Sequence, residues 1–160
     1  MRSEGRYPSL QDVKRIAEIK RPLRGELTVP GDKSIAHRAV ILASIADGRS
    51  RIYNLSGGDD NSRTVRAFRQ MGVEVYREGE AFCVDGRGWA GMAAPRETID
   101  CGNSGTTMRL LSGLLSGRPF ISQLDGDWSL RQRPMQRVMD PLSRMGAKIV
   151  SKNGNSLAPL

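Results

Sequence analysis

An internal repeat constrains the fold of this chain more than any other feature of its sequence. Residues 68–73 (FRQMGV) are matched by residues 142–147 (LSRMGA), and the two methionines lie 74 positions apart. A Gly-Arg pair after an apolar run also recurs, at Gly48 and Gly117, 69 positions apart. Recurrence at a fixed period indicates one supersecondary unit used twice, so we expect two related units.

Each unit is predicted to have the order β-α-β-α-β-β. In the first unit Ser34 is the expected cap of a helix that ends before Gly48, and Asp59-Asp60-Asn61 is the expected start of another. The first unit is predicted to contain strands at 26–29, 51–55, 73–76 and 81–84, the last two as a hairpin, and a helix at 35–46.

The second unit repeats this order. Asn103 and Ser104 are the expected caps of a helix that ends at Gly117, and a further helix is expected from near Pro134, kinked at Pro141. Strands are predicted at 98–100, 119–124 and 147–150, and the offset of 74 predicts a last strand that begins near residue 156 and is unfinished at residue 160.

The first helix of each unit is apolar on nearly every face. A helix of this kind is normally buried, so we expect an α/β fold with helices inside and sheet outside. The apolar residues are Ile35, Ala39, Val40, Ile41, Leu42, Ala43 and Ile45 in one helix and Met108, Leu110, Leu111, Leu114 and Leu115 in the other.

Composition excludes several classes of protein. No apolar run approaches the length of a membrane span, and Cys83 and Cys101 cannot make a disulfide scaffold. The single histidine makes a zinc site unexpected. The first 24 residues lack the apolar centre of a secretion signal, although Leu10, Val13 and Ala17 have the spacing of a short helix before Pro22. We therefore expect a reduced, cytoplasmic protein.

The net charge of +8 leaves the nature of the ligand open. Only eight aromatic residues accompany 20 arginines, which are scattered along the chain, so a nucleic-acid surface is not expected. Arginine suits capture of carboxylate and phosphate groups, but most of these side chains are expected to form a solvated basic surface.

Three motifs place polar residues where anions could bind. In the first, PGDKSIAHR, Lys33 and Ser34 lie at a helix N-terminus and Arg38 lies one turn later. In the second, DCGNSGTTMR, small residues surround Asn103, and Arg109 lies one turn into the helix.

The third motif, GDWSLRQRPM, puts Arg133 at the positive end of a helix, where a cation is unfavourable. Each motif alone is also explained by ordinary caps, turns and solvated charges. Two such motifs at matching places in two repeats make coincidence less probable.

Together, the runs PGDKSxxHR, GNSGTxxR and RPM resemble the 5-enolpyruvylshikimate-3-phosphate synthase family in order and spacing, from about residue 23 to residue 160. The resemblance implies an inside-out α/β barrel of the enolpyruvyl transferase type. It implies a lead segment at 1–22, one unit at 23–90 and a truncated unit at 91–160. The rest of the N-terminal domain and the whole C-terminal domain would be absent.

The resemblance also implies a reaction, the transfer of the enolpyruvyl group of phosphoenolpyruvate to the 5-hydroxyl of shikimate 3-phosphate with release of phosphate. Lys33 would be catalytic and contact both substrates. Ser34 and Arg38 would hold shikimate 3-phosphate. The phosphoenolpyruvate site would include Gly105 and Arg133, supported by Asn103 and Arg109. No metal or organic cofactor is implied.

The family's catalytic carboxylates lie beyond the matched segment, so this chain is expected to need a complementary C-terminal chain for activity. Asp59, Asp60 and Asp127 are expected to be caps and turns, and His37 and Cys101 are expected to pack. Two alternatives stay open: a non-catalytic substrate-binding fragment, and part of a UDP-N-acetylglucosamine enolpyruvyl transferase. Glyphosate, an anionic mimic, is a further possible ligand of the phosphoenolpyruvate site.

Overall fold

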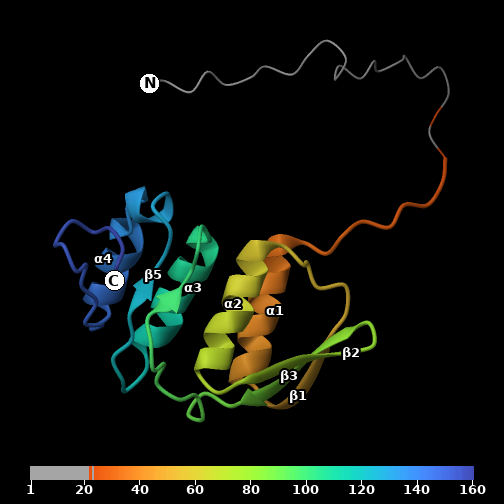
Figure 1. Cartoon of the computed structure of the whole chain (residues 1–160), viewed down its shortest axis with the longest axis horizontal. Coiled ribbons are helices and arrows are strands. Elements are labelled where there is room, and N and C mark those ends of the chain that lie inside the picture. The colour runs from red at the N-terminus through yellow and green to blue at the C-terminus, as the bar shows by residue number, and fades with distance from the viewer. Residues whose placement is uncertain (1–21, 23) are drawn as a thin grey trace.

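The computed structural model describes residues 22 and 24–160 (Figure 1). The expected short helix around Leu10, Val13 and Ala17 lies outside these residues. Three helices run side by side through the centre of the described part, with a three-stranded sheet against two of them and a two-stranded sheet beside the third (Figure 1).

The first unit contains two helices and an antiparallel sheet. Helix α1 (Lys33–Ile45) is followed by β1 (Asp47–Ile52), α2 (Asp59–Gln70), β2 (Glu74–Glu78) and β3 (Ala81–Arg87). Strand β3 lies between β1 and β2, with Ile52 opposite Phe82 and Glu78 opposite Ala81. The predicted hairpin is confirmed.

The second unit contains shorter strands. Strand β4 (Ile99–Asp100) pairs in parallel with β5 (Leu124–Asp125), and α3 (Gly105–Ser116) connects them. A 3₁₀ turn, η2 (Leu130–Gln132), precedes α4 (Gln136–Arg144). Pro141 lies inside α4, as the sequence predicted.

The sequence repeat has a direct counterpart in the backbone at the ends of α2 and α4. Gly72 and Gly146 both have positive φ, at 84° and 97°. Beyond them, the Val73 N–H donates to the Phe68 carbonyl and the Ala147 N–H donates to the Leu142 carbonyl, both at 3.0 Å. This is the Schellman arrangement, in which a glycine ends the helix at low steric cost. The repeated Met-Gly therefore encodes the same helix end twice.

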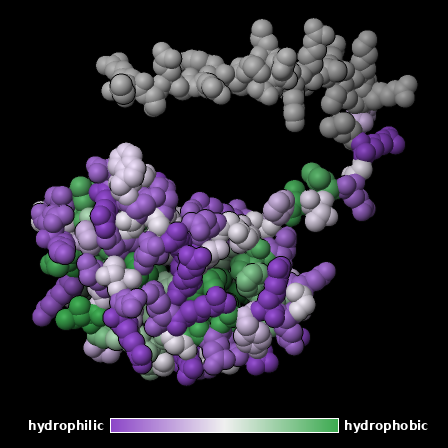
Figure 2. Space-filling view, in the orientation of Figure 1, coloured by the Kyte–Doolittle hydropathy of each residue, from purple (hydrophilic) through white to green (hydrophobic). Residues whose placement is uncertain are grey.

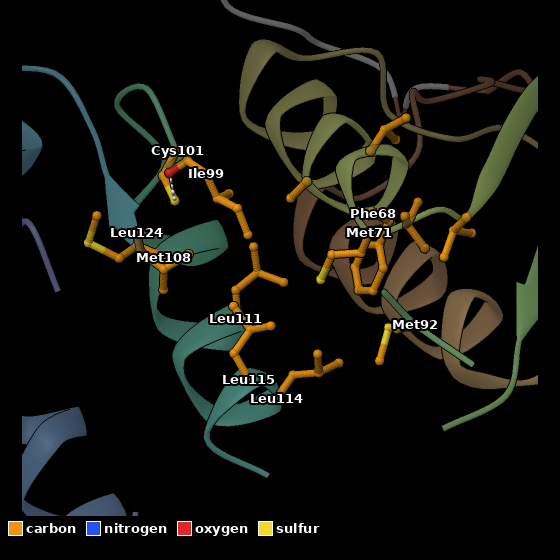
Figure 3. Close-up of a cluster of buried hydrophobic side chains, with 14 of the residues drawn as sticks. Phe68, Met71, Met92, Ile99, Cys101, Met108, Leu111, Leu114, Leu115 and Leu124 are labelled. Atoms are coloured by element: carbon orange, nitrogen blue, oxygen red, sulfur yellow. Dashed lines mark hydrogen bonds between the residues drawn. The ribbon is translucent and has the colours of Figure 1, made fainter. Parts of the chain in front are cut away.

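The core lies between the three central helices. Figure 3 shows Phe68 and Met71 of α2 pointing toward Leu111, Leu114 and Leu115 of α3. Burying a side chain of this size contributes about 1.5–3 kcal/mol relative to leaving it exposed. The expectation that the apolar helix of the second unit is buried is confirmed, because its apolar residues apart from Leu110 lie in this core.

The same expectation is only partly right for α1. Val40 and Ala43 are buried, but Ile35 and Leu42 are 68% and 63% exposed. The sheet and α2 cover one side of this helix, and no described element covers the other. The amphipathic helix α4 also has no fully buried residue, and Met145 is 82% exposed.

Several predicted strands are wrong in this structure. Residues 26–29, 119–123 and 147–150 form no strand, and residues 156–160 make only isolated sheet-like bonds. Leu27 is 85% exposed and has no sheet partner among the described residues. The physical reason is that a strand needs a neighbour for its backbone groups, and local sequence does not report whether that neighbour is present.

The predicted element boundaries also need correction. Asp32 rather than Ser34 caps α1, since its carboxylate accepts from the Ile35 N–H at 2.7 Å. The helix ends at Ile45, so Gly48 lies within β1, which begins before the predicted 51–55 strand. In α3 the cap is Ser104 alone, because Asn103 is engaged elsewhere.

The surface mixes apolar and polar patches on the face shown in Figure 2. Among the described residues, no helix is both long and apolar enough to cross a membrane. Cys83 and Cys101 are buried free thiols, and burial raises the pKa of Cys101 to about 12. Cys101 therefore packs, as expected.

Candidate active site

The N-terminal ends of α1, α2 and α3 lie at the same end of the molecule (Figure 1). Asp60, in the first turn of α2, connects them. Its carboxylate pairs with the Lys33 ammonium of α1, and its backbone carbonyl accepts a 3.2 Å hydrogen bond from the Thr107 hydroxyl of α3. Helix N-termini carry partial positive charge, so three at one end favour anions there.

The first motif lies on the exposed side of this end. Lys33 and Ser34 occupy the first turn of α1, and Arg38 follows one turn later. The Arg38 guanidinium donates to the Ser34 carbonyl at 3.1 Å, which holds the arginine along the helix toward its N-terminus. All three side chains are exposed, so they are accessible to a ligand.

A buried polar chain joins the three helices beneath this surface. His37 Nδ1 lies 2.7 Å from the Thr64 hydroxyl, which lies 2.8 Å from the Thr107 hydroxyl. The Thr107 hydroxyl also lies 2.8 Å from the Ser104 hydroxyl. Burial, partly offset by Asp60, lowers the pKa of His37. His37 therefore packs as predicted, but within a network that sets the relative position of the helices.

The second motif brings arginines against the N-terminus of α3. A Cβ at Gly105 would collide with the Arg109 guanidinium, which would have to shift, and would lie 3.4 Å from Arg133 Nη1, so glycine lets Arg109 take its present position beside Arg133. Arg109 Nε is buried without a hydrogen-bond partner. Burial lowers the pKa of Arg109, and the charges of Arg137 and Arg133 lower it further.

The third motif is coupled to the second through Asn103. Its amide nitrogen donates to both carboxylate oxygens of Asp127, at 2.9 and 3.2 Å, and its amide oxygen accepts from Arg133. Asp127 also accepts the Leu130 N–H at 2.8 Å, which with the Asn103 bond lowers its pKa. Asp127 is a turn residue as predicted, and it also orients Asn103.

Sequence reasoning missed Arg137 and the role of Asp60. Arg137 follows Arg133 by four residues and contributes to the field that lowers the pKa of Arg109. The four-residue spacing of two arginines at the start of an amphipathic helix could have identified Arg137 from the sequence. Among the described residues, none of Arg109, Arg133 and Arg137 forms an ion pair with a carboxylate. We call these three residues the arginine cluster.

The predicted site residues thus fall into two groups. Asn103, Gly105, Arg109 and Arg133 are in direct contact, whereas Lys33, Ser34 and Arg38 form a second group on α1. Asp60 and the buried polar chain connect the two groups. Chemically, the arrangement can bind anionic groups at two neighbouring places.

Asp59 plays no part in either group, because it pairs with Arg63, which also pairs with Asp100. Asp60 lies beside the group on α1 and is paired with Lys33. Asp127 lies beside the other group and accepts hydrogen bonds from Asn103. Their observed contacts are those of residues that position neighbouring groups.

Comparison with known proteins identifies the family of the chain. Residues 17–160 match the family model described as EPSP synthase (3-phosphoshikimate 1-carboxyvinyltransferase). A 3-phosphoshikimate 1-carboxyvinyltransferase of Geotalea uraniireducens is 53% identical over 138 residues, 86% of this chain and 32% of that protein. One from Geobacter sulfurreducens is 50% identical over 140 residues, 88% of this chain and 33% of that protein.

A solved structure agrees as well. The EPSP synthase of Acinetobacter baumannii superposes with a TM-score of 0.80 at 42% identity, over 84% of this chain and 31% of that one. This match confirms the predicted fold class, an incomplete α/β barrel of the enolpyruvyl transferase type. The chain spans about a third of the length of the relatives that it matches. On its sequence motifs, its fold and these matches, the chain belongs to the EPSP synthase family.

Proposed function

We propose that this chain forms part of a transferase that moves the enolpyruvyl group of phosphoenolpyruvate to the 5-hydroxyl of shikimate 3-phosphate and releases phosphate. The arginine cluster carries the proposal. Arg109 and Arg133 lie against Gly105 at the N-terminus of α3, the charge of Arg137 acts on Arg109, and no described carboxylate pairs with any of the three. Such an arrangement is costly unless an anion occupies it, and both substrates are anions.

The two groups of residues correspond to the two substrates in this proposal. Ser34 and Arg38 bind shikimate 3-phosphate, Gly105 and Arg133 bind phosphoenolpyruvate, and Lys33 contacts both. Arg109 and Asn103 act as supporting residues, because one fills the space behind Gly105 and the other holds Arg133. As C2 of phosphoenolpyruvate becomes tetrahedral, these fixed positive groups stabilise the developing charge.

The ion pair between Lys33 and Asp60 fits a role for Lys33 in substrate binding. Asp60 keeps the ammonium close to the N-terminus of α3. Lys33 is more than half exposed, so an incoming phosphate or carboxylate group can reach it. An anion placed between Lys33 and the arginine cluster would contact both groups.

A complementary portion of the enzyme is part of the proposal. The relatives are about three times as long as the segment matched here, and we propose that the proton-transfer carboxylates lie in the remainder. The divisions at 1–22, 23–90 and 91–160, and a cytoplasmic location, remain predictions from the sequence.

Reconstitution tests the activity. This chain is co-expressed with the remaining portion of the Geotalea uraniireducens relative, and phosphate release from the two substrates is measured. We expect release with the unmodified chain and at least a hundredfold loss with Arg133→Ala. The matched control is Arg144→Ala, at the exposed C-terminal end of α4, which should retain activity. A folded complex without phosphate release would refute the proposal.

A second candidate is a binding fragment without catalysis. The exposed group on α1 favours it, because Lys33, Ser34 and Arg38 are accessible in the chain by itself. Calorimetry of this chain with shikimate 3-phosphate should then show binding that Lys33→Ala and Arg38→Ala each remove. Unchanged binding in both variants would mean that these residues only cap and solvate the helix.

The names of the relatives favour shikimate 3-phosphate over UDP-N-acetylglucosamine as acceptor. We also propose that glyphosate binds beside Gly105, since an anionic mimic would use the same guanidinium groups. In the reconstituted enzyme Gly105→Ala should then reduce inhibition, because the added methyl group displaces Arg109. Equal inhibition of both forms would exclude this binding place.

A further inference from the structure

Helices α1 and α2 lie side by side (Figure 1), and two polar contacts join them one helical turn apart. At the N-terminal end, the Lys33 ammonium of α1 pairs with the Asp60 carboxylate of α2. Four residues further along each helix, His37 Nδ1 lies 2.7 Å from the Thr64 hydroxyl. Residues four apart share a helix face, so the buried imidazole lies about one turn below the exposed ion pair.

The direction of the hydrogen bonds fixes which nitrogen of His37 carries the proton. The Asp60 backbone carbonyl can only accept, so the Thr107 hydroxyl donates its proton there, at 3.2 Å. Each hydroxyl has a single proton to donate. Thr107 must then accept from the Thr64 hydroxyl, 2.8 Å away, and Thr64 must accept from His37. Neutral His37 is therefore protonated at Nδ1, and the lone pair belongs to Nε2.

The Nε2 atom of His37 is the open position in this arrangement. It is buried, and none of the residues that the structure describes gives it a hydrogen-bond partner. A buried polar atom without a partner is uncommon and costs free energy. Nothing in the proposed reaction uses this nitrogen. Its lone pair can accept one proton, which would put a positive charge beneath the group of residues on α1.

The charges around His37 decide whether it accepts that proton. Burial lowers the pKa of His37 most, Asp60 of α2 raises it, and Lys33 and Arg38 of α1 lower it further. Within the described part of the chain, neither α3 nor the sheet presents a charged group to the imidazole. Helix α3 reaches it only through the uncharged Thr107 hydroxyl, by way of Thr64. These groups keep His37 neutral near pH 7.

An anion on α1 would change this balance. A phosphate group bound to Lys33 and Arg38 offsets the two positive charges that oppose protonation of the imidazole. A phosphate group that draws Lys33 toward itself also weakens the pairing of Lys33 with Asp60, so the carboxylate acts more strongly on His37. Both changes favour the imidazolium form. Because linkage is reciprocal, a proton that the anion favours also strengthens binding of the anion.

We propose that His37 is a further residue of the phosphate site on α1, and that it takes up one proton from solvent at Nε2 when a phosphate group binds to Lys33 and Arg38. The imidazolium adds a third positive charge beneath the bound phosphate. The proposal rests on the proposed function in taking shikimate 3-phosphate as the ligand. It adds a residue and a proton to that site.

The titration of His37 can be followed directly, because the chain has a single histidine. The chain is given isotope-labelled histidine and combined with the unlabelled remaining portion of the Geotalea uraniireducens relative, and NMR records the midpoint of the titration. Saturating shikimate 3-phosphate should raise this midpoint by at least about half a pH unit. Arg38→Gln should raise it without ligand, since one opposing charge is removed. Lys148→Gln is the matched control and should leave it unchanged, because this exposed charge does not act on His37.

The pH dependence of binding separates this role from a structural one. His37→Asn keeps a polar atom near the position of Nδ1, which can still bond to Thr64, but it has no nitrogen to protonate at Nε2. Its affinity for shikimate 3-phosphate, measured by calorimetry, should fall at least threefold at about pH 6 and by less than about 1.5-fold at about pH 8. A residue that only packs would lower the affinity equally at both pH values.

Three outcomes would overturn the inference and leave the proposed function standing. They are a midpoint that does not move when the ligand binds, a midpoint that Arg38→Gln leaves unchanged, and equal losses of affinity for His37→Asn at both pH values. A folded complex that does not bind shikimate 3-phosphate at all would refute the proposed function together with the inference.

Discussion

Replacing Thr107 by valine tests whether the buried polar chain holds the two halves of the site together. The Thr107 hydroxyl lies 2.8 Å from the Thr64 and Ser104 hydroxyls and 3.2 Å from the Asp60 carbonyl. Valine has nearly the same shape but leaves these buried groups with one partner fewer. Since a hydroxyl donates once and accepts here once, about two bonds are lost. At about 1 kcal/mol each, the free energy of unfolding should fall by about 2 kcal/mol.

Urea denaturation followed by circular dichroism measures this loss. The control is Thr106→Val, at the neighbouring half-buried threonine, and it should change the free energy of unfolding by less than about 0.5 kcal/mol. Thr64→Val combined with Thr107→Val should cost less than the two single changes together, because the pair shares one hydrogen bond. Equal losses for Thr107→Val and Thr106→Val, or strict additivity, would refute the network.

Three further predictions concern separate features. Burial lowers the pKa of His37 below 6.5, so the unfolded chain binds a proton at a higher pH than the folded chain, and the free energy of unfolding should decrease as pH falls below 6.5. In His37→Gln, the free energy of unfolding should change less between pH 7 and pH 5. Gly105→Ala should weaken phosphoenolpyruvate binding in the reconstituted complex by about tenfold, or 1.4 kcal/mol, by calorimetry, whereas Gly113→Ala in the open part of the same helix should not. Gly72→Ala, at φ 84°, should lower the free energy of unfolding by about 1 kcal/mol in urea titrations, and a smaller loss would contradict the steric account of this helix end.

Sequence patterns predicted the structure correctly where the contacts that stabilise an element join residues close in sequence. The Met-Gly repeats at 71–72 and 145–146 end their helices through bonds that span at most five residues. The hairpin of β2 and β3 is also local. The site motifs could be found for a similar reason, since Lys33 and Ser34 lie in the first turn of α1, and Ser34 and Arg38 share one helix face whatever surrounds it.

The contacts that assemble the site were not visible in the sequence. Asp127 and Asn103 are 24 positions apart, and Arg133 and Asn103 are 30 apart. Arg137 joins the cluster only because α4 is placed near α3. The pairing of Lys33 with Asp60 likewise depends on how α1 and α2 pack.

The repeated unit, the presence of the helices, the glycine ends of α2 and α4, and the charged residues near helix N-termini could all be read from the sequence, because they follow from contacts within a few residues. Which predicted strands form depends on the assembled fold. Residues 81–87 are a strand because β1 and β2 pair with them, whereas residues 119–123 are not, although their sequence predicts one. A strand is stabilised by its neighbours, and the presence of a neighbour is a property of the assembled fold.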